Sequence, residues 1–286
     1  MNRFILGVLS VFFLVMNVSC SGKTAQHNTA EQAVADVASV QEQGNEMTQT
    51  EAQRSFQWHD EAVIEIRSDE DIARIDEIFD PLLEAAPEGE TVRAPVHAVV
   101  FVDSVDALKT AVSRFDSIGD EVTTFEFRFM APIDNSEEEI HLHQVEGVPA
   151  RLILSGVGDK PVNVPLLRFD LRAAAVQIQN LSWDGGSLPM SYVHANVSQY
   201  FEMKDVTVSN NRYDSKQEPD ASPMFDIEPS DGAKLLARFE NVSFSHNAVH
   251  SLVYIPRKNA DVELQKKNLT FQENVCFPGS CASLGE

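Results

Sequence analysis

The sequence predicts an all-β protein whose short strands follow one another as stacked coils. One eight-residue phrase occurs four times in the second half of the chain. It is a short alternating strand, an Asn or Asp, and then Leu or Val, Ser or Thr, and an apolar residue. The copies are Val176–Trp183, Phe201–Val208, Ala237–Phe244 and Leu264–Phe271. They recur at intervals of about 25 to 36 residues, and self-similarity at such intervals is typical of stacked units.

The central residue of each copy marks a sharp corner; these residues are Asn180, Asp205, Asn241 and Asn268. Side chains alternate along a strand, so the residues four and two positions before the corner share one face. The residues one and three positions after it are apolar again. The alternation of inward-facing and outward-facing residues therefore shifts by one position at the corner. Asn and Asp tolerate the left-handed conformation that a tight turn requires. We therefore expect both arms of each corner to point inward and the corner side chains of neighbouring coils to form a hydrogen-bonded ladder.

The segment before the repeats contains elements that we expect to cover the N-terminal end of the coils. In order, they are a strand over 62–66, a helix from Ser68 to Pro87, a strand over 94–102 and an amphipathic helix over 105–112. An uncovered coil end would expose strand edges and apolar core. We therefore place an N-terminal α/β capping region at residues 56–115 and the coils at residues 116–275.

The entrance to the coils carries a further pattern. Gly119-Asp120 leads into strands over 125–129, 140–145 and 151–156. Together with the four corners, this pattern resembles the right-handed parallel β-helix, or pectate-lyase-like, superfamily, including its polysaccharide lyases of the chondroitinase B and alginate lyase type. The resemblance covers roughly residues 96–275. An antiparallel β-sandwich is the alternative fold, although the chain has few hairpin turns of the Asn-Gly kind.

The N-terminus has the composition of an export signal. Arg3 is followed by an apolar stretch from Phe4 to Met16, so we assign residues 1–19 as a signal peptide. The sequence around Cys20 resembles a bacterial lipoprotein signal, which implies a lipidated Cys20 and a place in the bacterial cell envelope as an outer membrane lipoprotein. A soluble secreted product is the alternative. Residues 20–55 are polar and lack apolar periodicity, and we expect a disordered tether.

The charge of the chain excludes some partners. The formal net charge is −22 and the pI about 4.6. Nucleic acid is excluded as a partner because phosphate binding requires clustered Lys and Arg. Attraction to anionic lipid is also disfavoured, so we expect membrane contact through the lipid anchor only. A strongly anionic polysaccharide would need calcium or a local basic cluster.

The two remaining cysteines lie near the C-terminus. Cys276 and Cys281 flank a Pro-Gly turn, and in an oxidising compartment this spacing predicts a disulfide. We therefore assign residues 276–286 as a C-terminal disulfide loop and tail.

A candidate ligand-binding groove follows from the strand that precedes each repeat. These first strands are predicted over 166–171, 192–197, 224–228 and 252–257. Their outward residues are Arg168, Asp170, Tyr192, His194, Asp226, Glu228 and Tyr254. Aromatic faces pack on sugar rings and polar groups bind hydroxyls, so the pattern is compatible with a polysaccharide groove. An ordinary solvated sheet face is the alternative.

No acid–base constellation identifies a reaction, so we expect a non-catalytic binding or structural module for a polysaccharide or a surface protein. The alternative is a polysaccharide lyase, for which the resemblance implies calcium. Asp170, Asp226 and Glu228 would then supply carboxylates, and Arg168 or Arg257 the base. We expect no other cofactor. His246 and His250 are four residues apart without a helical pattern, and we assign no metal ligands.

Overall fold

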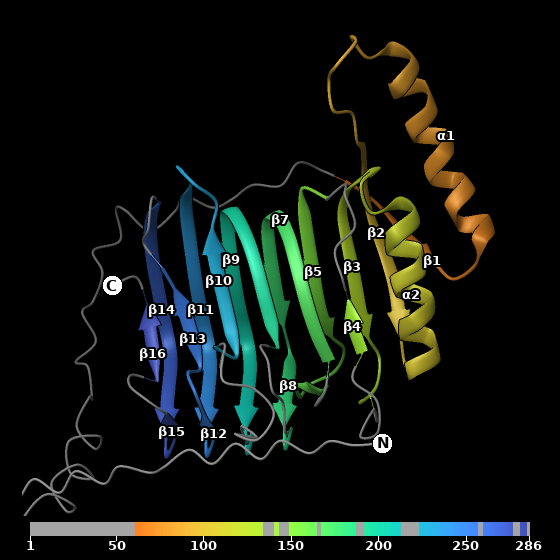
Figure 1. Ribbon diagram of the computed structural model, residues 1–286. Helices are drawn as coiled ribbons and strands as arrows, with labels where there is room; N and C mark the ends of the chain where they lie inside the picture. Colours follow the sequence, from red (N-terminus) through yellow and green to blue (C-terminus); the bar gives the residue numbers. More distant parts are fainter. Residues whose placement is uncertain are drawn as a thin grey trace, which may run out of the picture. The chain divides into compact units, whose positions relative to one another are not determined.

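The computed structural model describes residues 61–133, 140–142, 149–164, 167–186, 192–212, 223–256, 260–276 and 281–284. The chain divides into two compact units, Met1–Phe56 and Gln57–Glu286, and every described element belongs to the second unit. This unit is a right-handed parallel β-helix of about six turns with an N-terminal α/β region. Figure 1 shows the strands stacked side by side, with α1 and α2 at the end of the stack where β1 and β2 lie. The predicted signal peptide, Cys20, the tether and Arg257 lie outside the described residues.

The α/β region consists of β1 (Ala62–Ile66), α1 (Asp69–Ala85), β2 (Ala94–Val102) and α2 (Val105–Ile118). Helix α1 begins after Ser68, whose backbone N–H donates to the Asp71 carboxylate at 2.9 Å. Helix α2 is longer than predicted because its apolar stripe continues through the buried Phe115 and Ile118. Neither these nor any other helix in the described part of the chain is long and apolar enough to cross a membrane.

Parallel strands make up the coils. They are β3 (Val122–Phe129), β4 (Ile140–Leu142), β5 (Arg151–Gly156), β6 (Val162–Asn163), β7 (Leu167–Gln179), β8 (Leu181–Asp184), β9 (Val193–Ser209), β10 (Phe225–Pro229), β11 (Lys234–Ser245), β12 (Ala248–Val249), β13 (Val253–Ile255), β14 (Asp261–Gln272), β15 (Val275–Cys276) and β16 (Ala282–Leu284). All pairings between these described strands are parallel. This result excludes the antiparallel sandwich and confirms the predicted β-helix.

Long strands run through more than one face; β9, for example, pairs with both segments of β7 and then with β8, so it contributes to three faces. We call the face formed by β4, the first halves of β7 and β9, β10, β13 and β16 the first sheet. The second sheet joins β1, β2, β3 and β5 to the second half of β7 and the middle of β9, and continues into β11 and β14. The third sheet lies beyond the corners and includes β6 and β8.

The predicted corners separate the second sheet from the third. Asn180, Asp205, Asn241 and Asn268 all have positive φ, between 52° and 56°. The side-chain amide of Asn241 donates to Asp205 Oδ1 at 2.8 Å, and that of Asn268 donates to Asn241 Oδ1 at 2.8 Å. The left-handed turn is therefore confirmed at all four corners, and the ladder is confirmed for Asp205, Asn241 and Asn268. The Asn180 side-chain amide instead donates to the backbone carbonyls of Gly156 and Gly158.

A second ladder, which we did not predict, lies inside the next corner. Asn211 Nδ2 donates to Asn247 Oδ1, and Asn247 Nδ2 donates to Asn274 Oδ1, each at 2.9 Å. The residue before each of these Asn residues has positive φ; these residues are Asn210, His246 and Glu273. Asn211 and Asn247 are buried, so this ladder satisfies backbone and amide groups that water cannot reach.

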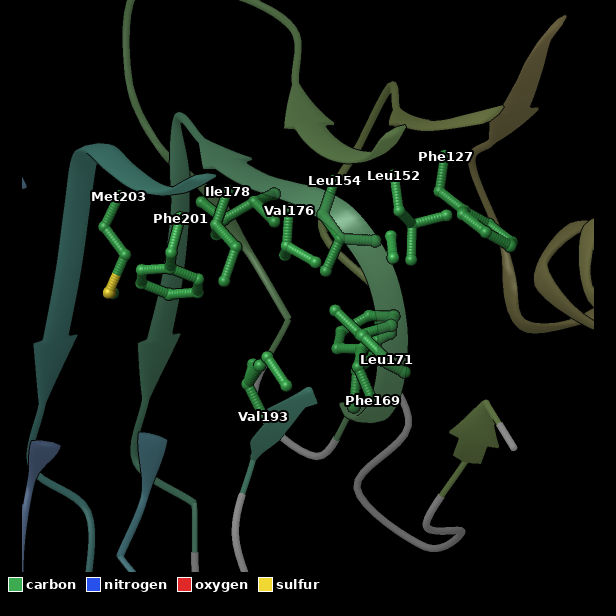
Figure 2. Packing of buried hydrophobic residues seen from close by; sticks show 14 of the residues in the cluster. Phe127, Leu152, Leu154, Phe169, Leu171, Val176, Ile178, Val193, Phe201 and Met203 are labelled. Atoms are coloured by element: carbon green, nitrogen blue, oxygen red, sulfur yellow. The ribbon is translucent and has the colours of Figure 1, made fainter. Parts of the chain in front are cut away.

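Apolar residues from successive coils stack in columns inside the β-helix. Figure 2 shows part of one column, in which Leu152, Val176 and Phe201 are in register on neighbouring strands. Leu154, Ile178, Met203 and Phe239 form the next column. All of these side chains are buried, as the predicted alternation of inward-facing and outward-facing residues requires.

The last coil has an exposed edge. Lys266 of β14 is in register with the buried Phe239 but is itself exposed. Phe271 stacks on Phe244 with ring centroids 5.2 Å apart, yet it is 41% exposed. Among the described strands, β14 pairs only with β11. Cys276 and Cys281 form a disulfide that closes the loop after β15.

Candidate functional site

The outer face of the first sheet carries a row of polar residues on consecutive strands. Asp170 of β7 is in register with His194 of β9, His194 with Asp226 of β10, and Asp226 with Tyr254 of β13. Their immediate neighbours along each strand point inward and are buried, so alternation directs this row outward. We call these four residues the polar row.

A second row lies two positions further along the same strands, and it contains Arg172, Asn196 and Glu228 in register. Asn196 Oδ1 accepts a hydrogen bond from Ser230 Oγ at 3.0 Å. We did not single out Arg172 and Asn196 from the sequence. The period-two alternation that placed Asp170 and His194 on this face also identifies them, because each is two residues further along the same strand.

His194 lies between two carboxylates. Its Nδ1 is 3.2 Å from Asp170 Oδ1, and its Nε2 is 3.6 Å from Glu228 Oε2. All three side chains are about half exposed. The imidazole is therefore oriented from both sides while it remains open to solvent.

Asp226 differs from the other carboxylates on this face because it is partly buried. Its Oδ1 is inaccessible to solvent and has no hydrogen-bond partner among the described residues. Burial raises the pKa of Asp226, the nearby His194 opposes that shift, and the negative charge of Glu228 adds to it. Asp226 is thus a carboxylate whose negative charge is poorly compensated in the protein alone.

The arrangement brings three ligand-type atoms together. His194, Asp226 and Glu228 each offer one such atom, and these atoms all lie within 4.8 Å of one another. From the sequence, all three residues are expected to face outward; Asp226 and Glu228 have a calcium role only in the lyase alternative, and His194 has no metal role. The cross-strand register, which unites residues more than thirty positions apart in the chain, is the information that the sequence alone did not supply.

The remaining candidates have different positions. Arg168 and Tyr254 lie outward as expected, and Tyr254 is 38% exposed. We expected Tyr192 to face outward, but it is only 1% exposed and its hydroxyl donates to Asn211 Oδ1 at 2.6 Å. Tyr192 precedes the first residue of β9, so strand alternation does not determine its direction. It belongs to the core and not to the outer face.

Comparisons with known proteins add no family assignment. The chain matches no protein-family model, and searches of curated proteins and of solved structures also find no match. The fold and the geometry of the first sheet are therefore the basis for a functional proposal.

Proposed function

We propose that this protein is an envelope-anchored bacterial lipoprotein whose β-helix binds a polysaccharide on the outer face of the first sheet without catalysing a reaction. The observation that carries this proposal is the polar row, in which carboxylates, an imidazole and an exposed aromatic ring occupy consecutive coils. Successive coils are about 4.8 Å apart, so such a row presents a regular series of groups to an extended chain of sugars.

Each part of the row suits a carbohydrate ligand. The ring of Tyr254 is exposed and offers an apolar face for a sugar ring, while Asp170 and His194 offer hydrogen-bonding groups for hydroxyls. The resemblance to the pectate-lyase-like superfamily supports the same class of ligand. The charge of −22 favours a neutral polysaccharide over a strongly anionic one.

A polysaccharide lyase acting along the same face is the second candidate. The observation that favours it is the raised pKa of Asp226 beside His194, since a shifted pKa is common among catalytic groups. Calcium is the ion that the resemblance implies for a lyase. The Asp226 and Glu228 oxygens suit calcium, but the third nearby ligand atom is a nitrogen of His194, which calcium does not favour. The residues present do not fit a calcium site, and we derive no catalytic step through that ion.

A screen of the Gln57–Glu286 unit against a panel of neutral and uronate-containing polysaccharides separates the two candidates. Retardation in gels that contain the polysaccharide reports binding, and new ultraviolet absorbance from an unsaturated uronic acid reports lyase turnover. We expect retardation by at least one neutral polysaccharide and no turnover. Turnover would replace the binding function with the lyase, and no effect in either assay would contradict both.

A further inference from the structure

We propose that His194, Asp226 and Glu228 hold one divalent transition-metal cation, for which Zn²⁺ is the representative. Their three ligand atoms lie within 4.8 Å of one another, and no other group of this kind occurs among the described residues. The proposal goes beyond polysaccharide binding because the cation site is complete without a sugar.

The distances are close to those that a cation requires. Ligand atoms placed about 2.1 Å from a tetrahedral Zn²⁺ are about 3.4 Å from one another. His194 Nε2 and Glu228 Oε2 are already 3.6 Å apart. All three ligand atoms lie within 4.8 Å of one another, so changes of side-chain torsion, without a change of the backbone, would bring them to these separations.

Asp170 prepares His194 for this role. Its Oδ1 lies 3.2 Å from His194 Nδ1, the ring nitrogen that faces away from Glu228. A carboxylate in this position favours the tautomer that carries its proton on Nδ1, which leaves the lone pair of Nε2 available for a cation. Asp170 is thus a positioning residue, and the chain of carboxylate, histidine and cation is a common arrangement around bound metals.

Asp226 supplies an observation that is independent of the contact between Asp170 and His194. Its Oδ1 is buried and has no hydrogen-bond partner in the described part of the chain, although a buried carboxylate oxygen is costly without one. A cation held between Asp226 and Glu228 would compensate both negative charges. The β10 strand fixes these two residues on one face because they are two positions apart.

The ligand types select the ion. An imidazole nitrogen suits zinc, nickel, cobalt and copper, whereas calcium and magnesium prefer ligand sets made only of oxygen. Three protein ligands also leave a position for water, as in open zinc sites. The half-exposed His194 and Glu228 give the ion access from solvent.

Two other contacts between a histidine and a carboxylate lack features that the group of His194, Asp226 and Glu228 has. The carboxylate of Glu126, which lies 2.7 Å from His97 Nε2, is already occupied by Arg128 and Ser155. His246 and Glu273 are 3.0 Å apart and exposed, but they have no third ligand among the described residues. The pair of His246 and Glu273 provides a matched control for substitutions of His194.

The test is isothermal titration calorimetry of the purified, chelator-treated protein, with Zn²⁺ as the titrant in one experiment and Ca²⁺ in another. Co²⁺ is used as a spectroscopic probe, because its visible absorption reports the number and type of ligands. We expect one Zn²⁺ per chain and an affinity for Ca²⁺ at least about tenfold weaker. Saturation by Ca²⁺ at equal or lower concentration, or no saturation by Zn²⁺, would overturn the proposal.

Variants locate the site. We expect His194→Gln and Asp226→Asn to weaken Zn²⁺ binding by more than about tenfold, and Asp170→Asn to weaken it by roughly 10- to 100-fold through the orientation of His194. His246→Gln should leave binding unchanged. Equal binding by wild type and His194→Gln would refute the site. These results do not depend on any polysaccharide, so failure of the metal site and failure of the proposed binding function are distinguishable.

Discussion

At the scale of single residues, Glu126 shows how a buried charge is accommodated in this fold. Its side chain lies on β3, the residue is only 4% exposed, and its oxygens accept from Arg128 Nε at 2.8 Å and Nη2 at 2.9 Å. Burial alone would raise the pKa of Glu126, but contacts with His97, Arg128 and Ser155 outweigh it and lower the pKa to about 2. Asp226 has no such set of partners, and this difference separates a structural carboxylate from a candidate ligand.

The low pKa of Glu126 predicts a specific dependence of stability on pH. An acid whose pKa is lower in the folded state stabilises the protein above its unfolded pKa, near 4.5, and this contribution is lost as the pH falls toward 2. We expect Glu126→Gln to lose about 3 kcal/mol of unfolding free energy at neutral pH and much less at pH values near 2. Denaturant unfolding at a series of pH values measures both quantities.

The exposed Glu263→Gln is the control for that experiment, because its carboxylate lies on the exposed strand β14. The unfolding free energy of Glu263→Gln should change with pH as that of the wild type does. If the unfolding free energies of Glu126→Gln and wild type differed by the same amount at every acidic pH, the lowered pKa assigned to Glu126 would be wrong.

Residue-scale features were only partly predictable. The outward direction of Asp170, His194, Asp226 and Glu228 follows from alternation inside strands and is predictable from the sequence. Tyr192 was misplaced because it lies just before the first residue of β9, where strand alternation does not fix the direction of a side chain. The contact of Asp226 with His194 depends on cross-strand register, which one sequence does not reveal.

At the scale of elements, the corner explains why the repeat is visible in the sequence. Each coil needs a residue that adopts positive φ and whose side chain bonds along the stack, and Asn meets both needs. The second ladder is not apparent in the sequence, because the residues that adopt positive φ there share no chemical type. They are Asn210, His246 and Glu273. Only the following Asn is constant, and a single constant residue is a weak signal.

Two substitutions at one corner separate backbone strain from the ladder. Both Asn241→Gly and Asn241→Val remove the hydrogen bonds to Asp205 and Asn268, at a cost of roughly 1 kcal/mol. Only Val adds the penalty of a β-branched side chain at a φ of 54°, which we expect to cost about 1–2 kcal/mol more. Thermal or denaturant unfolding measures the difference. Equal destabilisation by Gly and Val would contradict the assigned conformation.

At the scale of the whole molecule, the two ends of the β-helix differ. The α/β region lies at the N-terminal end, where α2 buries Phe115 against Phe125 and Phe127. At the other end, the described part of the chain leaves β14 with one paired edge and places the exposed Lys266 in a core column. A charged residue at such a position opposes edge-to-edge association of strands.

The anchor is a property of the whole molecule that biochemistry must test. We expect the wild-type protein, expressed in bacteria, to incorporate labelled fatty acid and to fractionate with membranes. Cys20→Ser should lose both properties, because no other residue has the predicted lipidation context. A variant with Cys276→Ser and Cys281→Ser should keep both. Retention of the label by Cys20→Ser would refute the lipoprotein assignment.

Polysaccharide binding on the first sheet is tested by comparing wild type with Tyr254→Ala in gels that contain the polysaccharide identified by the screen. Tyr254 supplies the exposed aromatic ring of the polar row, and Phe271→Ala is the control because Phe271 is equally exposed on the third sheet. We predict that Tyr254→Ala loses most of the retardation, by roughly 1–3 kcal/mol of binding free energy for a hot-spot aromatic residue, and that Phe271→Ala retains it. Undiminished retardation of Tyr254→Ala would show that the first sheet is not the binding face.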